Sequence, residues 1–69
     1  MPPHPRPRDF VVCKRGSKWG VVRANGMLVT YEPTKNRCVR TAKILATAGH
    51  VLSFLLRSNG TYVRLRRRL

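Results

Sequence analysis

The side chains best suited to catalysis are few in this 69-residue chain, which has two acids, two histidines and two cysteines. The acids, Asp9 and Glu32, are far apart in the sequence, and no nucleophile comes with both a base and a residue to orient that base. No glycine-rich loop has the spacing that cradles phosphates. We therefore expect no enzymatic activity, and interpret His50, next to Gly49, as a turn or packing residue.

A metal site would have to draw on Cys13, Cys38, His50 and His4. The first three could converge if neighbouring strands pair, but no Cys-x-x-Cys spacing is present. Isolated cysteines more often act as small buried hydrophobes. We expect no metal and no other cofactor; a disulfide between Cys13 and Cys38 is conceivable, but no sequence feature supports it.

Charge is the strongest signal, because fifteen Lys and Arg face two acids and give a formal net charge of +13. So small a domain cannot neutralise this charge internally, and the default partner is a polyanion such as nucleic acid. Eleven of the cations are Arg, whose planar fork binds phosphates and base edges, which favours folded RNA. Besides Arg23, the candidate RNA-binding cations form three groups along the chain: Lys14, Arg15 and Lys18; Lys35, Arg37, Arg40 and Lys43; and Arg57, Arg64, Arg66, Arg67 and Arg68.

Aromatic side chains next to cations can stack on unpaired bases. Trp19, Tyr31 and Tyr62 qualify, with Lys18, Lys35 and Arg64 respectively close by in the sequence. Core packing is the alternative role for each. We expect Trp19 to be buried and leave both roles open for Tyr62.

The length allows one small domain. A chain near sixty residues buries only about 60% of its unfolded surface, so a binding partner is the expected stabiliser. Residues 1–8 carry four prolines and two arginines and predict an extended arm, either inserted between RNA helices or frayed. Residues 9–69 form the expected domain, with a basic strand or tail at its end.

Strand signals dominate the first half of the domain. Residues 9–14 are rich in β-formers, and Asn25-Gly26 between residues 19–23 and 27–32 predicts a hairpin. A two-residue turn there places Val22 opposite Val29, Arg23 opposite Leu28, and Trp19 near Glu32. Pro33 ends the second strand, and residues 34–37 are interpreted as a polar cationic loop.

The second half has two interpretations. Apolar residues from Ile44 to Leu56 recur at helical intervals, which predicts a helix over about residues 41–57 that ends at Asn59-Gly60. Alternatively the chain breaks at residues 48–50, and strands over 51–57 and 61–68 pair through a second Asn-Gly turn. That turn pairs Leu56 with Val63 and Phe54 with Leu65, and puts Tyr62, Arg64, Arg66 and Arg68 on the opposite face. The expected fold is a small β-rich domain of antiparallel hairpins with extended basic termini, or α+β if the helix forms.

A membrane role is the first alternative function. Residues 42–56 are the most apolar stretch, but are shorter than the ~20 apolar residues that span a bilayer and include Lys43 and His50. We expect no membrane span and no secretory signal at the start of the chain. A membrane-active cationic peptide would use this stretch as an amphipathic anchor. A DNA-compacting protein and a small nuclease acting through His50 are further alternatives.

Two segments carry a family resemblance: residues 22–26, Val-Arg-Ala-Asn-Gly, and residues 31–37, Tyr-Glu-Pro-Thr-Lys-Asn-Arg. Together they resemble bacterial-type large-subunit ribosomal protein thirty-three, with weaker similarity at residues 43–45 and 50–52. The resemblance implies an all-β fold, and ribosomal RNA contacts by Tyr31, Thr34, Lys35, Asn36 and Arg37. The paired Cys-x-x-Cys motifs of the zinc-carrying branch are missing, which implies the metal-free branch. Residues 59–69 extend past the match, and the helical periodicity departs from the family's fold.

We therefore expect a structural, non-enzymatic constituent of the large ribosomal subunit that clamps ribosomal RNA. The expected partners are ribosomal RNA and neighbouring large-subunit proteins, with no small-molecule substrate. A divergent member with a basic extension suits a mitochondrial ribosome, in the matrix, or another bacterial-type ribosome. Composition alone supports only a small basic nucleic-acid-binding protein.

Overall fold

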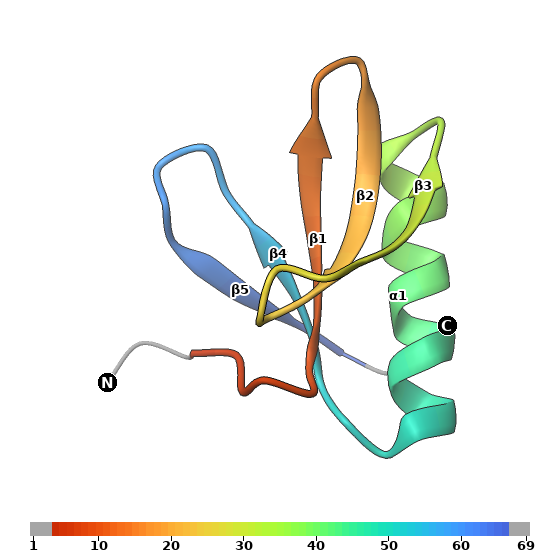
Figure 1. Ribbon diagram of the computed structural model, residues 1–69, viewed down its shortest axis with the longest axis vertical. Helices are drawn as coiled ribbons and strands as arrows, with labels where there is room; N and C mark the ends of the chain where they lie inside the picture. Colours follow the sequence, from red (N-terminus) through yellow and green to blue (C-terminus); the bar gives the residue numbers. More distant parts are fainter. Residues whose placement is uncertain (1–3, 67–69) are drawn as a thin grey trace.

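The computed structural model describes residues 4–66, which form one five-stranded sheet with a single helix on one of its faces (Figure 1). The elements in chain order are β1 (Phe10–Arg15), β2 (Lys18–Arg23), β3 (Leu28–Glu32), α1 (Lys35–Gly49), β4 (Ser53–Leu56) and β5 (Tyr62–Leu65). The strand order in the sheet is β3-β2-β1-β4-β5. The small β-rich domain is confirmed, and α+β describes it as well.

The sheet is mixed, because β1 and β4 run parallel while the other neighbouring strands are antiparallel. A parallel pair needs a long crossover connection, and α1 with its flanking loops supplies it between β3 and β4. The prediction of antiparallel hairpins alone is therefore wrong for the centre of the sheet. The predicted break at residues 48–50 is correct.

Side chains are buried on both faces of the sheet. On the helix side, Phe10, Val12 and Val21 pack with the three buried side chains of α1, which are Cys38, Ala42 and Ala46. These small residues recur every four positions and let the helix approach the sheet closely. On the opposite face, called the open face below, Val11, Cys13 and Val22 pack with Leu56 and Tyr62.

The helix begins earlier and ends earlier than predicted. Thr34 is its N-cap, with extended backbone, and its Oγ1 accepts a hydrogen bond of 3.2 Å from the Arg37 amide. His50 ends it in the left-handed region at φ 55°, and its amide donates to the carbonyls of Ala46 and Thr47. Residues 34–37 are thus a cap and first turn instead of a loop. The helix predicted over 41–57 is wrong in its bounds, because residues 53–56 form β4.

Both Asn-Gly turns close as three-residue loops, which corrects the predicted registers. The Arg23 amide donates to the Met27 carbonyl at 2.8 Å, and the Arg57 amide donates to the Thr61 carbonyl at 2.8 Å. Gly26 and Gly60 adopt positive φ, the glycine position typical of such loops. In each loop the asparagine Oδ1 accepts the amide two residues on.

The extra loop residue shifts the strand partners. Val22 pairs with Leu28 instead of Val29, and an irregularity beside Val21 restores the predicted pairing of Trp19 with Glu32. In the second hairpin Leu56 pairs with Tyr62, so the predicted pairing with Val63 is wrong by one residue. Paired residues share a face, and Tyr62 and Arg64 therefore lie on the same face as Leu56 and Phe54, instead of opposite them.

Candidate nucleic-acid interface

Both carboxylates of the chain are engaged within the fold. Asp9 is buried, and its two oxygens accept hydrogen bonds from the backbone amides of Arg6 and Leu52 at 2.8 and 3.0 Å. Glu32 accepts a hydrogen bond of 3.1 Å from the Thr41 hydroxyl and so joins β3 to α1. The acids thus help to hold the structure together, and in the part of the chain that the structure describes neither of them is exposed among the surface cations.

Cations gather at one end of the sheet, called the loop end below. The β1–β2 turn, the β4–β5 turn and the start of α1 lie at this end, because β1 and β4 run toward it and β3 ends there (Figure 1). The exposed cations at the loop end are Lys14, Arg15, Lys18, Lys35, Arg37 and Arg57. The fold therefore brings together members of all three groups of cations that the sequence separates.

The open face carries three cross-strand rows, which follow from the strand register. Nearest the loop end, Arg15 pairs with Lys18. The next row runs from Tyr31 through Gly20 and Cys13 toward Leu56 and Tyr62. The third row contains Leu28, Val22, Val11, Phe54 and Arg64. A tyrosine thus lies at each edge of the sheet, with small and apolar residues between them and cations at the margin.

Tyr31 is the most exposed Phe, Tyr or Trp of the described residues, with 47% of its surface exposed. A side chain at Gly20 would begin 3.1 Å from Arg15 Cγ and 3.4 Å from Leu28 Cδ1, and 3.8 Å from the Tyr31 ring. The three side chains therefore converge over the bare backbone of Gly20. Lys18 Nζ lies 5.8 Å from the Tyr31 ring centre, within the range of cation–π attraction.

Tyr62 at the other edge is half-buried. Its ring lies 5.6 Å from the His4 ring of the N-terminal arm and meets the Phe54 ring edge-on at 6.3 Å. Trp19 lies on the helix side and packs against the core, where it is half-buried instead of fully buried as predicted, with Lys35 Nζ 6.0 Å from its ring. The cation–aromatic pairs thus differ from the sequence neighbours: Lys18 lies over Tyr31, and Lys35 lies over Trp19.

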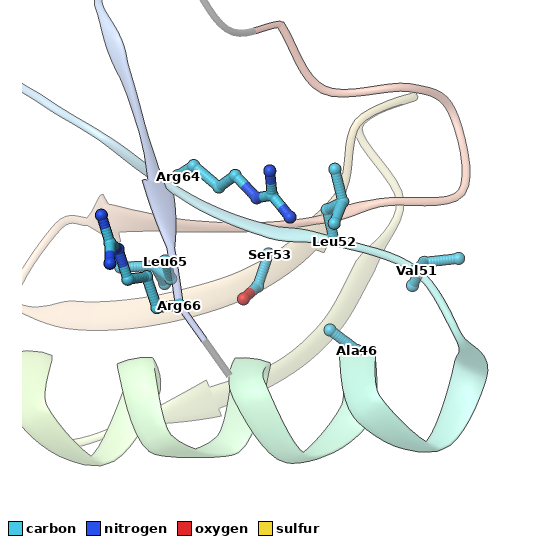
Figure 2. A pocket seen from close by; sticks show the side chains of 7 residues that line it. All are labelled: Ala46, Val51, Leu52, Ser53, Arg64, Leu65 and Arg66. Atoms are coloured by element: carbon cyan, nitrogen blue, oxygen red, sulfur yellow. The ribbon is translucent and has the colours of Figure 1, made fainter. Parts of the chain in front are cut away.

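Two grooves lie away from the loop end, on either side of Arg64. One, of about 550 Å³, lies between the end of α1 and β5, and in Figure 2 Ser53 faces Ala46 of the helix while Arg64 reaches toward Leu52. The other, of about 790 Å³, lies under the arm and is lined by Arg6, Arg8 and Arg64 among others. Arg6 and Arg8 were not among the RNA-binding residues predicted from the sequence. The positive charge of the arm could have indicated them.

Several predicted site residues lie elsewhere or have structural roles. Arg23 packs over the Phe10 ring at 4.8 Å and donates to the Arg8 carbonyl, and Thr34 caps α1. Three further predicted RNA-binding residues, Asn36, Arg40 and Lys43, lie on α1. Arg66 follows β5, and Arg67 and Arg68 lie outside the described residues.

The cysteines do not form a chemical centre. Cys13 lies on the open face and Cys38 on the helix side, and both are free and buried. Burial raises the pKa of the Cys38 thiol from 9.0 to about 11, and the nearby Glu32 carboxylate and Cys13 add to the effect. Among residues 4–66, no three His, Cys, Asp or Glu side chains group as a metal site would require.

The apolar stretch over residues 42–56 is divided between the end of α1, a connecting loop and β4, so it is not one amphipathic helix. In the described part of the chain, no helix is both long and apolar enough to cross a bilayer. The chain matches no protein-family model, no curated protein and no solved structure.

Proposed function

We propose that this chain is an RNA-binding protein that neutralises phosphates with the cations of its loop end. The observation that supports this proposal is the position of the two acids, because both accept hydrogen bonds inside the fold and neither is exposed among the surface cations of residues 4–66. A cation-rich surface without acidic counterparts binds a polyanion and releases its counterions.

The shape of the charged surface favours RNA over duplex DNA. Loop-end cations project from two turns and a helix start, instead of lining one helix that fits a major groove. Contacts from several directions suit folded RNA, which proteins recognise by shape and by unpaired segments. The excess of Arg over Lys points the same way.

At a finer level we propose a structural role in a large ribosomal subunit, the mitochondrial one in the first place, without enzymatic activity. This placement is supported by the sequence resemblance alone. The segment that carries much of the resemblance, residues 34–37, is the cap and first turn of α1 instead of part of an all-β fold. The general RNA-binding proposal does not depend on it.

Binding to a structured RNA and to duplex DNA of equal phosphate number, measured at several salt concentrations, tests the general proposal. We expect tighter binding to RNA and an affinity that falls steeply between 50 and 200 mM salt. The triple variant Lys14→Gln, Arg15→Gln, Lys18→Gln should bind several-fold more weakly and with a shallower salt slope. Equal binding of both nucleic acids, or salt-independent binding, contradicts the proposal.

Sedimentation of the tagged protein from cell lysate through sucrose gradients tests the ribosomal placement. Cofractionation with the large subunit at low salt, and release at high salt, is the expected result. RNA binding in vitro without cofractionation would leave the general function intact and remove the ribosomal one.

A further inference from the structure

The open face around Tyr31 is an apolar and aromatic surface without cover from the rest of the described chain. Besides Tyr31, Leu28 is 38% exposed, although the register places it on the same face as the buried Val22. The helix lies on the opposite side of the sheet and covers none of it (Figure 1). Neighbouring exposed aromatic and apolar side chains on the surface of a small domain indicate a binding surface.

The cations around this surface determine what it fits. Arg15 packs its stem over Gly20 beside the Tyr31 ring, and Lys18 Nζ lies close to the same ring. Neither acid is exposed on the open face around Tyr31: Asp9 is buried before the start of β1, where it lines the groove under the arm together with Arg64, and Glu32 pairs with Trp19 on the helix side. A partner must therefore offer a flat apolar group for Tyr31 and negative charge one row away.

We infer that the open face is a stacking surface for the unpaired bases of single-stranded RNA, with Tyr31 as its principal contact; this inference rests on the RNA binding proposed above. A base stacks on the Tyr31 ring, and Arg15 and Lys18 bind the phosphates next to it. Sheets with aromatic side chains on one face bind two or three unpaired bases in this way in other RNA-binding domains.

The second tyrosine extends the surface. Four strand spacings separate β3 from β5, so Tyr31 and Tyr62 lie on strands about 19 Å apart. Arg64, two residues from Tyr62 on the same strand face, is a phosphate ligand for this edge. His4 already contacts the Tyr62 ring, which makes Tyr31 the primary position and Tyr62 a secondary one.

Fluorescence anisotropy with a labelled eight-nucleotide oligouridine tests the inference. Tyr31→Ala should weaken binding by about 5- to 100-fold, whereas Tyr31→Phe, which keeps the ring, should stay within about twofold of the unmodified chain. Ile44→Ala is the matched control, because Ile44 is 54% exposed on α1, away from the open face. It should leave the affinity unchanged. Circular dichroism verifies that each variant is folded.

Salt and strand form separate stacking from charge. Tyr31→Ala should keep the salt slope, and the double variant Arg15→Gln, Lys18→Gln should reduce it by about 1.4, or 0.7 for each lost phosphate contact. A duplex RNA of the same phosphate number should bind Tyr31→Ala as well as it binds the unmodified chain.

The outcomes distinguish the two proposals. Absence of oligouridine, structured RNA and duplex binding overturns the RNA-binding function and this inference with it. Normal RNA binding with equal affinities for Tyr31→Ala and Ile44→Ala overturns the stacking surface alone. A change in sedimentation mass caused by Tyr31→Ala would assign the open face to a contact between copies of the chain, and overturns the inference as well.

Discussion

The structural role of Asp9 could not be predicted from its residue type. In a chain with two acids it counts as a charge, but it is buried and bonded to two backbone amides. Its contacts join Arg6 of the arm to Leu52 at the entry to β4, across a long sequence separation. Because a buried side chain loses its contacts with water, these two bonds satisfy its oxygens and make Asp9 a central anchor of this fold.

Cys38 is the residue whose titration is linked to folding. Its folded pKa of about 11 exceeds the ordinary value of 9.0, so the folded state binds more protons than the unfolded state between these values. The associated stability is present below pH 9 and is lost as the pH rises toward 11. The change amounts to about 2–3 kcal/mol in the free energy of unfolding.

Urea denaturation at pH 8, 9 and 10.5 measures this effect. The comparison is with Cys38→Ala, which should lose part of the alkaline slope, and with Cys13→Ala, which should retain most of it because Cys13 is the smallest contributor to the raised pKa of Cys38. Identical slopes for all three chains would show that the Cys38 thiol is not linked to folding. At pH 8 we further expect the Cys38 thiol to react with a thiol reagent only as fast as the chain unfolds.

At the scale of elements, α1 begins with the wrong charges for a stable helix. Lys35 and Arg37 lie in its first turn, which contains no acid, although the amino end of a helix disfavours positive charge. The exposed Asn36 lies between them. This cost is offset only where phosphates approach, which agrees with the RNA-binding proposal for the loop end.

Asn36→Asp should therefore stabilise the free protein by about 0.3–1 kcal/mol at low salt. The substitution changes charge at nearly constant shape, and chemical denaturation measures it. Two variants at the other end of the helix, Ala48→Asn and Ala48→Asp, serve as the control, because they differ from each other by the same single charge. The difference between their free energies of unfolding should be smaller than that for Asn36→Asp, or of opposite sign. Equal gains at both ends would attribute the effect to net charge instead of to the helix.

Some boundaries of the helix and strands follow from short sequence patterns, and others do not. Strands β1 to β3 follow from β-formers around an Asn-Gly turn, and the pairing of Trp19 with Glu32 was predicted correctly. The start of α1 was missed because its cap and first turn are polar. Its buried side chains, Cys38, Ala42 and Ala46, are too small to give a strong periodic signal.

The candidate site was only partly predictable for a related reason. Charges and aromatic rings are visible in the sequence, but their grouping depends on the strand order and register. The contact of Tyr31 with Gly20 follows from the predicted pairing of Trp19 with Glu32 and could have been found. The row that continues to Tyr62 needs the parallel pairing of β1 with β4, which no local pattern encodes.

At the scale of the whole molecule, charge density is the dominant property. The chain has a net charge of +13, and its described residues extend over 29 × 26 × 21 Å. The Debye length is about 30 Å at 0.01 M salt and about 8 Å at 0.15 M, so at low salt every cation repels every other one. Like-charge repulsion of this kind destabilises the compact state.

The response of the melting temperature to salt should therefore change sign when RNA is added. Without RNA, raising NaCl from 10 to 150 mM screens the repulsion, and a gain of about 1 kcal/mol would raise the Tm by roughly 4–8 °C. With excess oligouridine the chain is stabilised by binding, and the same salt increase weakens that binding and lowers the Tm. Differential scanning fluorimetry with Trp19 emission measures both series. A Tm that falls with salt in the absence of RNA would show that the cations are compensated within the fold, and the physical basis for a polyanionic partner would be lost.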